Sequence, residues 1–171
     1  MTGRPRVLAV DDRRENLLAL QAILEGLAVE VVSVTSGEDA LKRLLTEDYA
    51  VILLDAHMPG MDGFETAGHI KQRERTRHIP VLFLTAVDYD PHLAFRGYQA
   101  GAVDYITKPF DPWVLRSKVG VFVDLWTVHT RLAEQAAECA RLRAAIDDAV
   151  ESLDDGATDE ARARLKAARD G

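Results

Sequence analysis

The chain has 171 residues, of which 47% are hydrophobic and 29% are charged, so it suits one packed domain with an appendage and excludes global disorder. The net charge of −7 argues against a general affinity for nucleic acid or for an anionic membrane. With one cysteine, no secretory signal and no apolar segment near the roughly 20 residues of a membrane helix, we expect a cytoplasmic protein.

Short apolar runs alternate with amphipathic stretches along the first two thirds of the chain. The runs that predict strands are 7–10, 29–34, 49–54, 80–84 and 102–106. Helical spacing, capping residues and prolines predict helices over 14–25, after Ser36, over 62–75, over 90–101 and from 111 onward. Five strand–helix pairs in this order predict a parallel sheet covered on both faces, with its ligand site at the carboxyl ends of the strands.

Chemically distinctive side chains stand at those strand ends. The first strand ends in Asp11 and Asp12, and the third ends in Asp55. The fourth ends in Thr85, and Lys108 follows the fifth. Three carboxylates at one edge repel one another and favour a bound cation. Hard oxygen donors without a cluster of cysteine or histidine favour Mg²⁺.

A magnesium ion beside a lysine and a threonine is typical of phosphoryl transfer. We expect Asp55 to attack phosphorus, because carboxylates can form acyl phosphates, and Lys108 and Thr85 to contact the phosphoryl oxygens. Each residue alone has an ordinary explanation as a cap, surface or packing residue, but their order on successive strands favours a site. The imidazole of His57 is not favoured as a metal ligand, since no histidine partner lies near it in the sequence.

These segments resemble the receiver domain of two-component response regulators. The matching pieces are VLAVDD (7–12), ILLDAHMPGMDGFE (52–65), LFLTA (82–86) and AGAVDYITKPF (100–110). The resemblance implies an α/β, flavodoxin-like fold with a doubly wound five-stranded parallel sheet in the order 2-1-3-4-5. It also implies that Asp55 accepts a phosphoryl group from a sensor histidine kinase or phosphotransfer protein, so the protein signals rather than catalyses an output reaction.

The resemblance also implies roles for the residues around Asp55. Asp12 and Asp55 are expected to bind Mg²⁺ directly, and Asp11 largely through water. The backbone carbonyl of His57 is expected to be a further ligand. The peptide bond between Lys108 and Pro109 is expected to be cis.

A switch pair follows from the same resemblance. Thr85 would move toward the phosphoryl group and Tyr105 would turn inward with it. The responding surface would be formed by the fourth helix, fifth strand and fifth helix, which carry Tyr98, Tyr105 and Trp113. For Tyr98 and Trp113 we favour partly buried packing over direct partner contact.

The last third of the chain carries a heptad pattern on one predicted helix. Its apolar members are Leu125, Val128, Leu132, Cys139, Leu142, Ile146 and Leu153, with Gln135 and Ala149 at two further positions. We therefore expect a receiver over 1–123, a coiled-coil dimerisation helix over 124–155 and a short helix or tail over 156–171, which could fold back on the coil. A helix that folds onto its receiver and a flexible linker are the alternatives. Cys139 would pack in the seam, with a disulfide between copies as a minor possibility.

The expected function is a phosphorylation-controlled homodimer that acts on an unknown downstream protein. One alternative is the regulatory front of a longer signalling enzyme, such as a histidine kinase, diguanylate cyclase or phosphatase. An aspartyl-phosphate phosphohydrolase is disfavoured because His57 stands where haloacid-dehalogenase-like enzymes have a second aspartate. A DNA-binding regulator is disfavoured because the tail has no basic recognition helix.

Overall fold

The computed structural model describes residues 3–86, 99, 101–154 and 158–170. The chain divides into two compact units, Gly3–Thr127 and Val128–Gly171. The predicted helix over 90–101 lies outside the described residues except for residues 99 and 101, and Tyr98 lies outside with it. Within the described ranges, no helix is both long enough and apolar enough to span a bilayer.

The first unit is built on a five-stranded parallel sheet. Its strands are β1 (Arg6–Val10), β2 (Glu30–Val34), β3 (Val51–Asp55), β4 (Val81–Thr85) and β5 (Asp104–Thr107). Their order across the sheet is β2-β1-β3-β4-β5, and every neighbouring pair is parallel. The predicted fold class and strand order are therefore confirmed.

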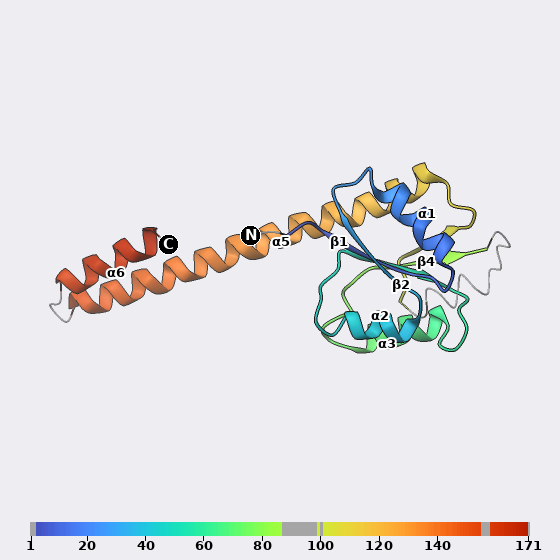
Figure 1. Cartoon of the computed structure of the whole chain (residues 1–171). Helices are drawn as coiled ribbons and strands as arrows, with labels where there is room; N and C mark the ends of the chain where they lie inside the picture. The colour runs from blue at the N-terminus through green and yellow to red at the C-terminus, as the bar shows by residue number, and fades with distance from the viewer. Residues whose placement is uncertain (1–2, 87–98, 100, 155–157, 171) are drawn as a thin grey trace. The chain divides into compact units, whose positions relative to one another are not determined.

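Helices cover both faces of this sheet. They are α1 (Arg14–Leu24), α2 (Gly37–Arg43), α3 (Gly63–Gln72) and the start of α5 (Pro112–Asp154). Figure 1 shows α2 and α3 on one face and α1 with the first turns of α5 on the other. Each crossover therefore returns the chain to the same edge of the sheet, so all strands end on one side.

Side-chain caps fix where three of these helices begin. The Ser36 hydroxyl accepts the Asp39 amide at 3.1 Å, and the Asp62 carboxylate accepts the Glu65 amide at 2.8 Å. Asp111 accepts the amide of Trp113 at 2.8 Å at the start of α5. These caps satisfy amides that have no partner inside the helix, as the sequence predicted.

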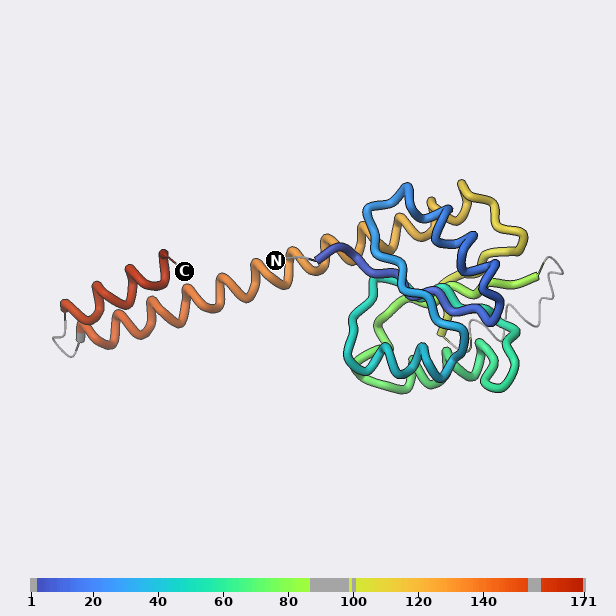
Figure 2. Tube along the Cα trace, viewed as in Figure 1, coloured from blue at the N-terminus to red at the C-terminus, as the bar shows by residue number. Residues whose placement is uncertain are grey.

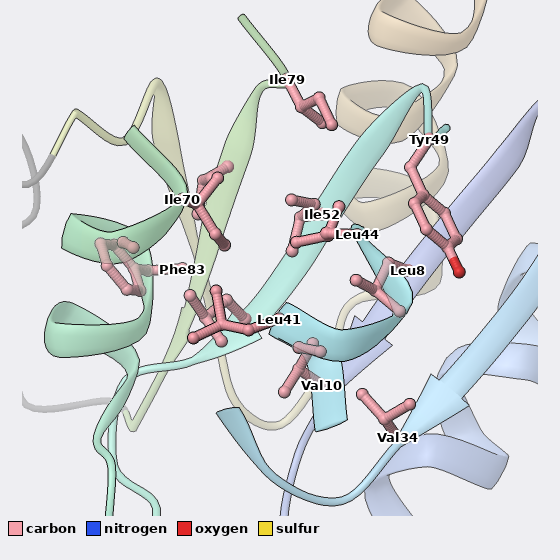
Figure 3. Close-up of a cluster of buried hydrophobic side chains, with 14 of the residues drawn as sticks. Leu8, Val10, Val34, Leu41, Leu44, Tyr49, Ile52, Ile70, Ile79 and Phe83 are labelled. Carbon is pink, nitrogen blue, oxygen red and sulfur yellow. The ribbon is translucent and has the colours of Figure 1, made fainter. Parts of the chain in front are cut away.

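Alternate residues of each strand supply two separate cores. Leu8, Ile52 and Phe83 point toward α2 and α3, and Figure 3 shows them packed with Leu41 and Ile70. Residues on the opposite face of the sheet pack against α1 and α5, and α5 makes the contacts that the sequence predicted. Those α5 residues are Leu115, Val119 and Phe122. Because both faces are buried, the strands are continuous apolar runs.

One packing expectation on α5 is wrong. Trp113 is 81% exposed instead of partly buried. The cap at Asp111 starts the helix at Pro112, and Leu115 and Val119, which are both fully buried, define the face that the helix turns to the sheet. Trp113 is therefore left on the solvent side by helical geometry.

The second unit contains the later part of α5 and the helix α6 (Thr158–Asp170). The trace in Figure 2 shows α6 running back beside the last turns of α5. One alanine on each helix, Ala149 and Ala161, is almost completely buried. Small side chains at this contact let the two backbones approach closely, as in other helix pairs.

Candidate functional site

Acidic side chains meet at the carboxyl edge of the sheet. Asp11 follows β1, Asp12 stands next to it, and Asp55 is the last residue of β3. Carboxylate oxygens of the three residues lie within 4.8 Å of one another. Asp11 and Asp55 are buried, whereas Asp12 is exposed. Parallel neighbours β1 and β3 bring these residues together, because both strands end at this edge.

Lys108 places its ammonium group between two of the carboxylates. Its Nζ lies 2.7 Å from Asp11 Oδ2 and 3.2 Å from Asp55 Oδ2. The residue follows β5, and its peptide bond to Pro109 is cis, which the resemblance implied. With 22% of its side chain exposed, the lysine is screened only partly by water, so it neutralises part of the buried negative charge.

Asp11 is held by more partners than the sequence indicated. Asn16, on the first turn of α1, donates its amide Nδ2 to both Asp11 oxygens at 3.0 Å. The Arg13 backbone amide donates to Asp11 Oδ1 at 2.9 Å. Together with Lys108, these donors fix the orientation of the Asp11 carboxylate. Sequence reasoning missed Asn16, because an asparagine in the first turn of a helix also has an ordinary capping explanation.

The carboxylate of Asp55 has fewer hydrogen-bond donors around it than the carboxylate of Asp11. Burial raises the pKa of its carboxyl group, and the nearby charge of Asp11 acts in the same direction. The His57 amide, which donates to Asp55 Oδ1 at 3.2 Å, and the Lys108 ammonium both oppose this increase in pKa. The carboxylate therefore gains from any further positive charge at this edge.

Two glycines shape the loop that follows Asp55. Gly60 has a φ of 77°, a left-handed conformation that suits glycine. At Gly63 a Cβ atom would lie 2.1 Å from the backbone oxygen of Asp55. The start of α3 therefore approaches the end of β3 closely, and the Gly63 amide donates to the Ala56 carbonyl at 3.1 Å.

The remaining predicted residues lie on β4 and β5. Thr85 ends β4 opposite Thr107, and its hydroxyl donates to the Ala86 carbonyl at 3.3 Å. Tyr105 is partly buried on β5 and packs against the core between the sheet and α2–α3. Lys118 of α5 donates to the Tyr105 carbonyl at 2.9 Å and lies 5.5 Å from the centre of its ring.

Lys118 was not predicted as part of this region. It also forms an ion pair with Asp104 at 2.7 Å, so three contacts join β5 to α5 around Tyr105. Residue spacing alone does not point from a lysine on a helix to a strand eleven or more residues away.

The donor set suits a hard divalent cation. All three clustered residues offer carboxylate oxygens, the ligands that Mg²⁺ prefers. The His57 side chain is exposed and is not part of this carboxylate cluster. A cation bound at these carboxylates, the Lys108 ammonium group and the Asp55 carboxylate would together form an arrangement that can accept a phosphoryl group.

Comparison with known proteins agrees with this fold. The family described as the response regulator receiver domain matches residues 7–120. The chain therefore belongs to the receiver-domain family of two-component signalling.

Similar proteins have different names, and the match covers only part of each of them. Response regulator PleD of Caulobacter vibrioides is 36% identical over 137 residues, which are 80% of this chain and 30% of PleD. Sensor histidine kinase GacS of Pseudomonas protegens is 40% identical over 108 residues, 61% of this chain and 12% of that protein. The transcriptional regulatory protein PhoP of Bacillus subtilis is 37% identical and matched over 46% of its length. The chain thus spans less than half of each of these relatives.

Solved structures align with the receiver part. The chemotaxis response regulator CheY4 of Vibrio cholerae is 28% identical with a TM-score of 0.65, covering 70% of this chain and 99% of that one. The receiver domain of a Pseudomonas aeruginosa sensor histidine kinase has the same identity and TM-score, and covers 71% of this chain and 99% of its own. That structure is described with a magnesium ion coordinated in its active-site cleft.

Proposed function

We propose that Asp55 accepts a phosphoryl group from a phosphohistidine of a sensor histidine kinase or phosphotransfer protein. The observation that carries this proposal is the position of the Lys108 ammonium, 3.2 Å from the Asp55 carboxylate and beside the other two acids. A buried carboxylate with a neighbouring cation can attack phosphorus while its partner stabilises the oxygens of the transferring group.

Magnesium is the cofactor that this donor set fits. Asp12 and Asp55 would bind it directly, Asp11 largely through water, and the His57 backbone carbonyl would add a further oxygen. When bound, Mg²⁺ neutralises charge on the phosphoryl oxygens. Asp11 suits an indirect role because Asn16 and Lys108 already occupy its oxygens.

The chain's own side chains then have distinct tasks. An Asp55 oxygen forms a bond to phosphorus while the bond between phosphorus and the donor's histidine nitrogen breaks, and the electron pair stays on that nitrogen. Lys108 stabilises one phosphoryl oxygen through its charge, and Thr85 donates its hydroxyl to another. Their positions at the ends of adjacent strands keep them oriented before the donor arrives.

Signal output would depend on a change at Tyr105. Thr85 shifts toward the phosphoryl group, and Tyr105 turns inward. The three contacts of Lys118 carry this change from β5 to α5. A downstream protein must bind one of the two states more tightly, because only differential affinity shifts the populations.

We also propose that the chain is a homodimer. The receiver would comprise 1–123, the dimerisation helix 124–155 and the tail 156–171. Leu125 and Cys139 would belong to the seam. Phosphorylation would alter the surface around the start of α5 and so change the dimer or its contact with a partner.

The experiment for the phosphoacceptor uses a small phosphodonor, acetyl phosphate, with and without Mg²⁺. Intact mass spectrometry should show one added phosphoryl group on the wild-type chain with Mg²⁺ and none on Asp55→Asn. Asp48→Asn, which changes an exposed carboxylate, is the matched control and should be labelled like wild type. Labelling of Asp55→Asn to the wild-type extent would remove Asp55 from this role.

A second candidate is the regulatory front of a longer signalling enzyme. It is favoured by the small share of the relatives that the chain matches, 30% of PleD and 12% of a sensor histidine kinase. In that case the helix α5 would connect the receiver to a kinase, cyclase or phosphatase. The reading frame of the gene after the codon for Gly171 distinguishes the two candidates at once.

A further inference from the structure

Large apolar side chains remain exposed along α5 in the Val128–Gly171 unit. They are Val128, Leu132, Leu142, Ile146, Val150 and Leu153. Leu132, for example, is 59% exposed. Their spacing of three, four and seven residues places them in one stripe on the helix. A row of exposed apolar side chains, interrupted at Gln135, indicates a surface that another protein covers.

The helix α6 does not cover this stripe. It packs where Ala149 is 2% exposed, with Ala145 and Ser152 half-buried one turn to either side. On α6 the matching position is Ala161, which is 1% exposed. At about 100° per residue, Ile146 lies roughly a quarter turn from the centre of this small-residue face. The helix α6 therefore flanks the stripe and leaves it open.

We propose that a second copy of this chain covers the stripe, parallel and in register, with each α6 lying beside the seam. This rests on the proposed homodimer and adds its orientation, its register and the place of α6. It also changes the seam expected from the heptads: because α6 already covers Ala149, contact in the last heptad passes to Ile146, Val150 and Leu153.

Charge complementarity favours a second copy in this arrangement. In the heptad register that has Leu125 at an a position, Glu138 takes a g position and Arg143 takes the following e position. A parallel, in-register pair brings g of one helix beside the following e of its partner, so two such attractive pairs form by symmetry. Glu138 also contacts Arg141 in its own helix, so in the dimer its carboxylate would lie between Arg141 and Arg143 of the second copy.

The polar residue inside the seam supports the same register. Gln135 stands at a d position among apolar neighbours. In register it faces the same amide of the second copy, so the two side chains can hydrogen-bond to each other. A shift by one heptad would place each amide against an apolar residue such as Val128 or Leu142, without a partner.

Charge-reversal variants of the full chain test the pairing. Glu138→Arg and Arg143→Glu each place like charges at both sites, so each variant alone should dimerise about tenfold more weakly. An equimolar mixture restores both attractive pairs in the heterodimer and should regain the wild-type dissociation constant. Sedimentation equilibrium measures all three samples. A mixture that binds no better than the single variants would overturn the parallel, in-register pairing.

The single cysteine tests the register directly. Cys139 is exposed and takes an a position, so the two copies should crosslink under mild oxidant to twice the chain mass of 18.9 kDa. The double variant Cys139→Ala/Ala137→Cys moves the thiol to an outward f position nearby and should crosslink far less. A dimer by light scattering whose Cys139 crosslinks no better than this control refutes the register. A monomer by light scattering refutes the homodimer itself, while labelling of Asp55 stays unaffected in both cases.

Removal of α6 tests whether this helix lies beside the apolar stripe of α5 or covers it. A chain that ends before residue 156 should stay dimeric, because α6 lies on the Ala149 face. Full-length monomers that become dimers only after this deletion would show that α6 covers the stripe, contrary to the proposal.

Discussion

Asp55 has an unfavourable position in the protein without a bound cation. Burial raises the pKa of its carboxyl group above the ordinary 3.8, so the folded chain holds this proton more tightly than the unfolded chain. The stability linked to this proton is therefore complete below pH 3.8 and is lost as the pH rises through the raised pKa. At neutral pH the ionised side chain opposes folding, and a cation relieves that cost.

Asp55→Asn should consequently unfold at a higher urea concentration than wild type at pH 7 in the presence of a chelator. The difference in unfolding urea concentration between the two proteins should narrow as the pH falls toward 4, because the wild-type carboxyl group takes up its proton. Asp48→Asn, at an exposed position, should show no such gap. A gap that grows on acidification would contradict the assigned direction of the Asp55 pKa.

Asn16 is expected to be the main positioning residue for Asp11. Asn16→Ala removes both amide contacts to that carboxylate, and loss of such a supporting contact weakens a metal site by about 10-fold or more. Calorimetric titration with Mg²⁺ should show this loss. The control is Gln21→Ala, which removes an amide on the same helix that donates to Ser33. Equal Mg²⁺ affinity of Asn16→Ala and Gln21→Ala would exclude the role.

The sequence revealed the charged residues of the site but not the residues that hold them in position. Asp55 and Lys108 stand at the ends of apolar runs, and a parallel sheet brings such ends together whatever the loops do. Asn16 and Lys118 each contact residues outside their own helix. Whether a helical side chain can make such a contact depends on the direction in which the helix presents it and on the distance between the helix and the sheet. An asparagine in a first helical turn also has an ordinary capping explanation, so it carried no distinct signal.

At the scale of elements, the closeness of α3 to β3 sets the position of Asp55. Gly63→Ala would place a methyl group 2.1 Å from the Asp55 backbone oxygen, so the helix or strand must shift. We expect a loss of about 1–3 kcal/mol in the free energy of unfolding. Urea unfolding measures it.

Gly68→Ala is the matched control on the same helix. Nothing lies within 4 Å of a Cβ atom at Gly68, and it sits inside a helix, so this substitution should gain about 0.5–1 kcal/mol. Equal effects at Gly63 and Gly68 would show that the close approach does not constrain the site.

The elements themselves were largely predictable because their signals are local. The caps at Ser36 and Asp62 form the expected hydrogen bonds with amides three residues later. Strand ends shifted by one or two residues, since periodicity does not show where hydrogen bonding between strands stops. Trp113 was misplaced because a large aromatic side chain near a helix start gives no indication of which face the helix turns to the sheet.

At the scale of the whole molecule, the first unit should fold and accept a phosphoryl group without the second unit. The core that anchors α5 in the first unit, Leu115, Val119 and Phe122, lies before residue 128. A chain ending at Thr127 should therefore stay folded, be monomeric by light scattering and accept a phosphoryl group at the wild-type rate from acetyl phosphate. Loss of phosphorylation in the folded fragment would show that the receiver depends on the second unit.

The arrangement inside the second unit was only partly predictable. The heptads predicted a long helix, and α5 is continuous from Pro112 to Asp154. That α6 would choose the face of Ala149 could not be foreseen, because alanines give almost no hydrophobic signal and their value lies in the close approach that they allow.

The most direct test of the central claim is to locate the phosphoryl group after reaction with acetyl phosphate and Mg²⁺. Borohydride reduces an acyl phosphate to the alcohol, which marks the modified side chain for peptide sequencing by mass spectrometry. The structure predicts that the mark lies on Asp55. A mark on Asp12, on another carboxylate, or on no aspartate at all would contradict the account.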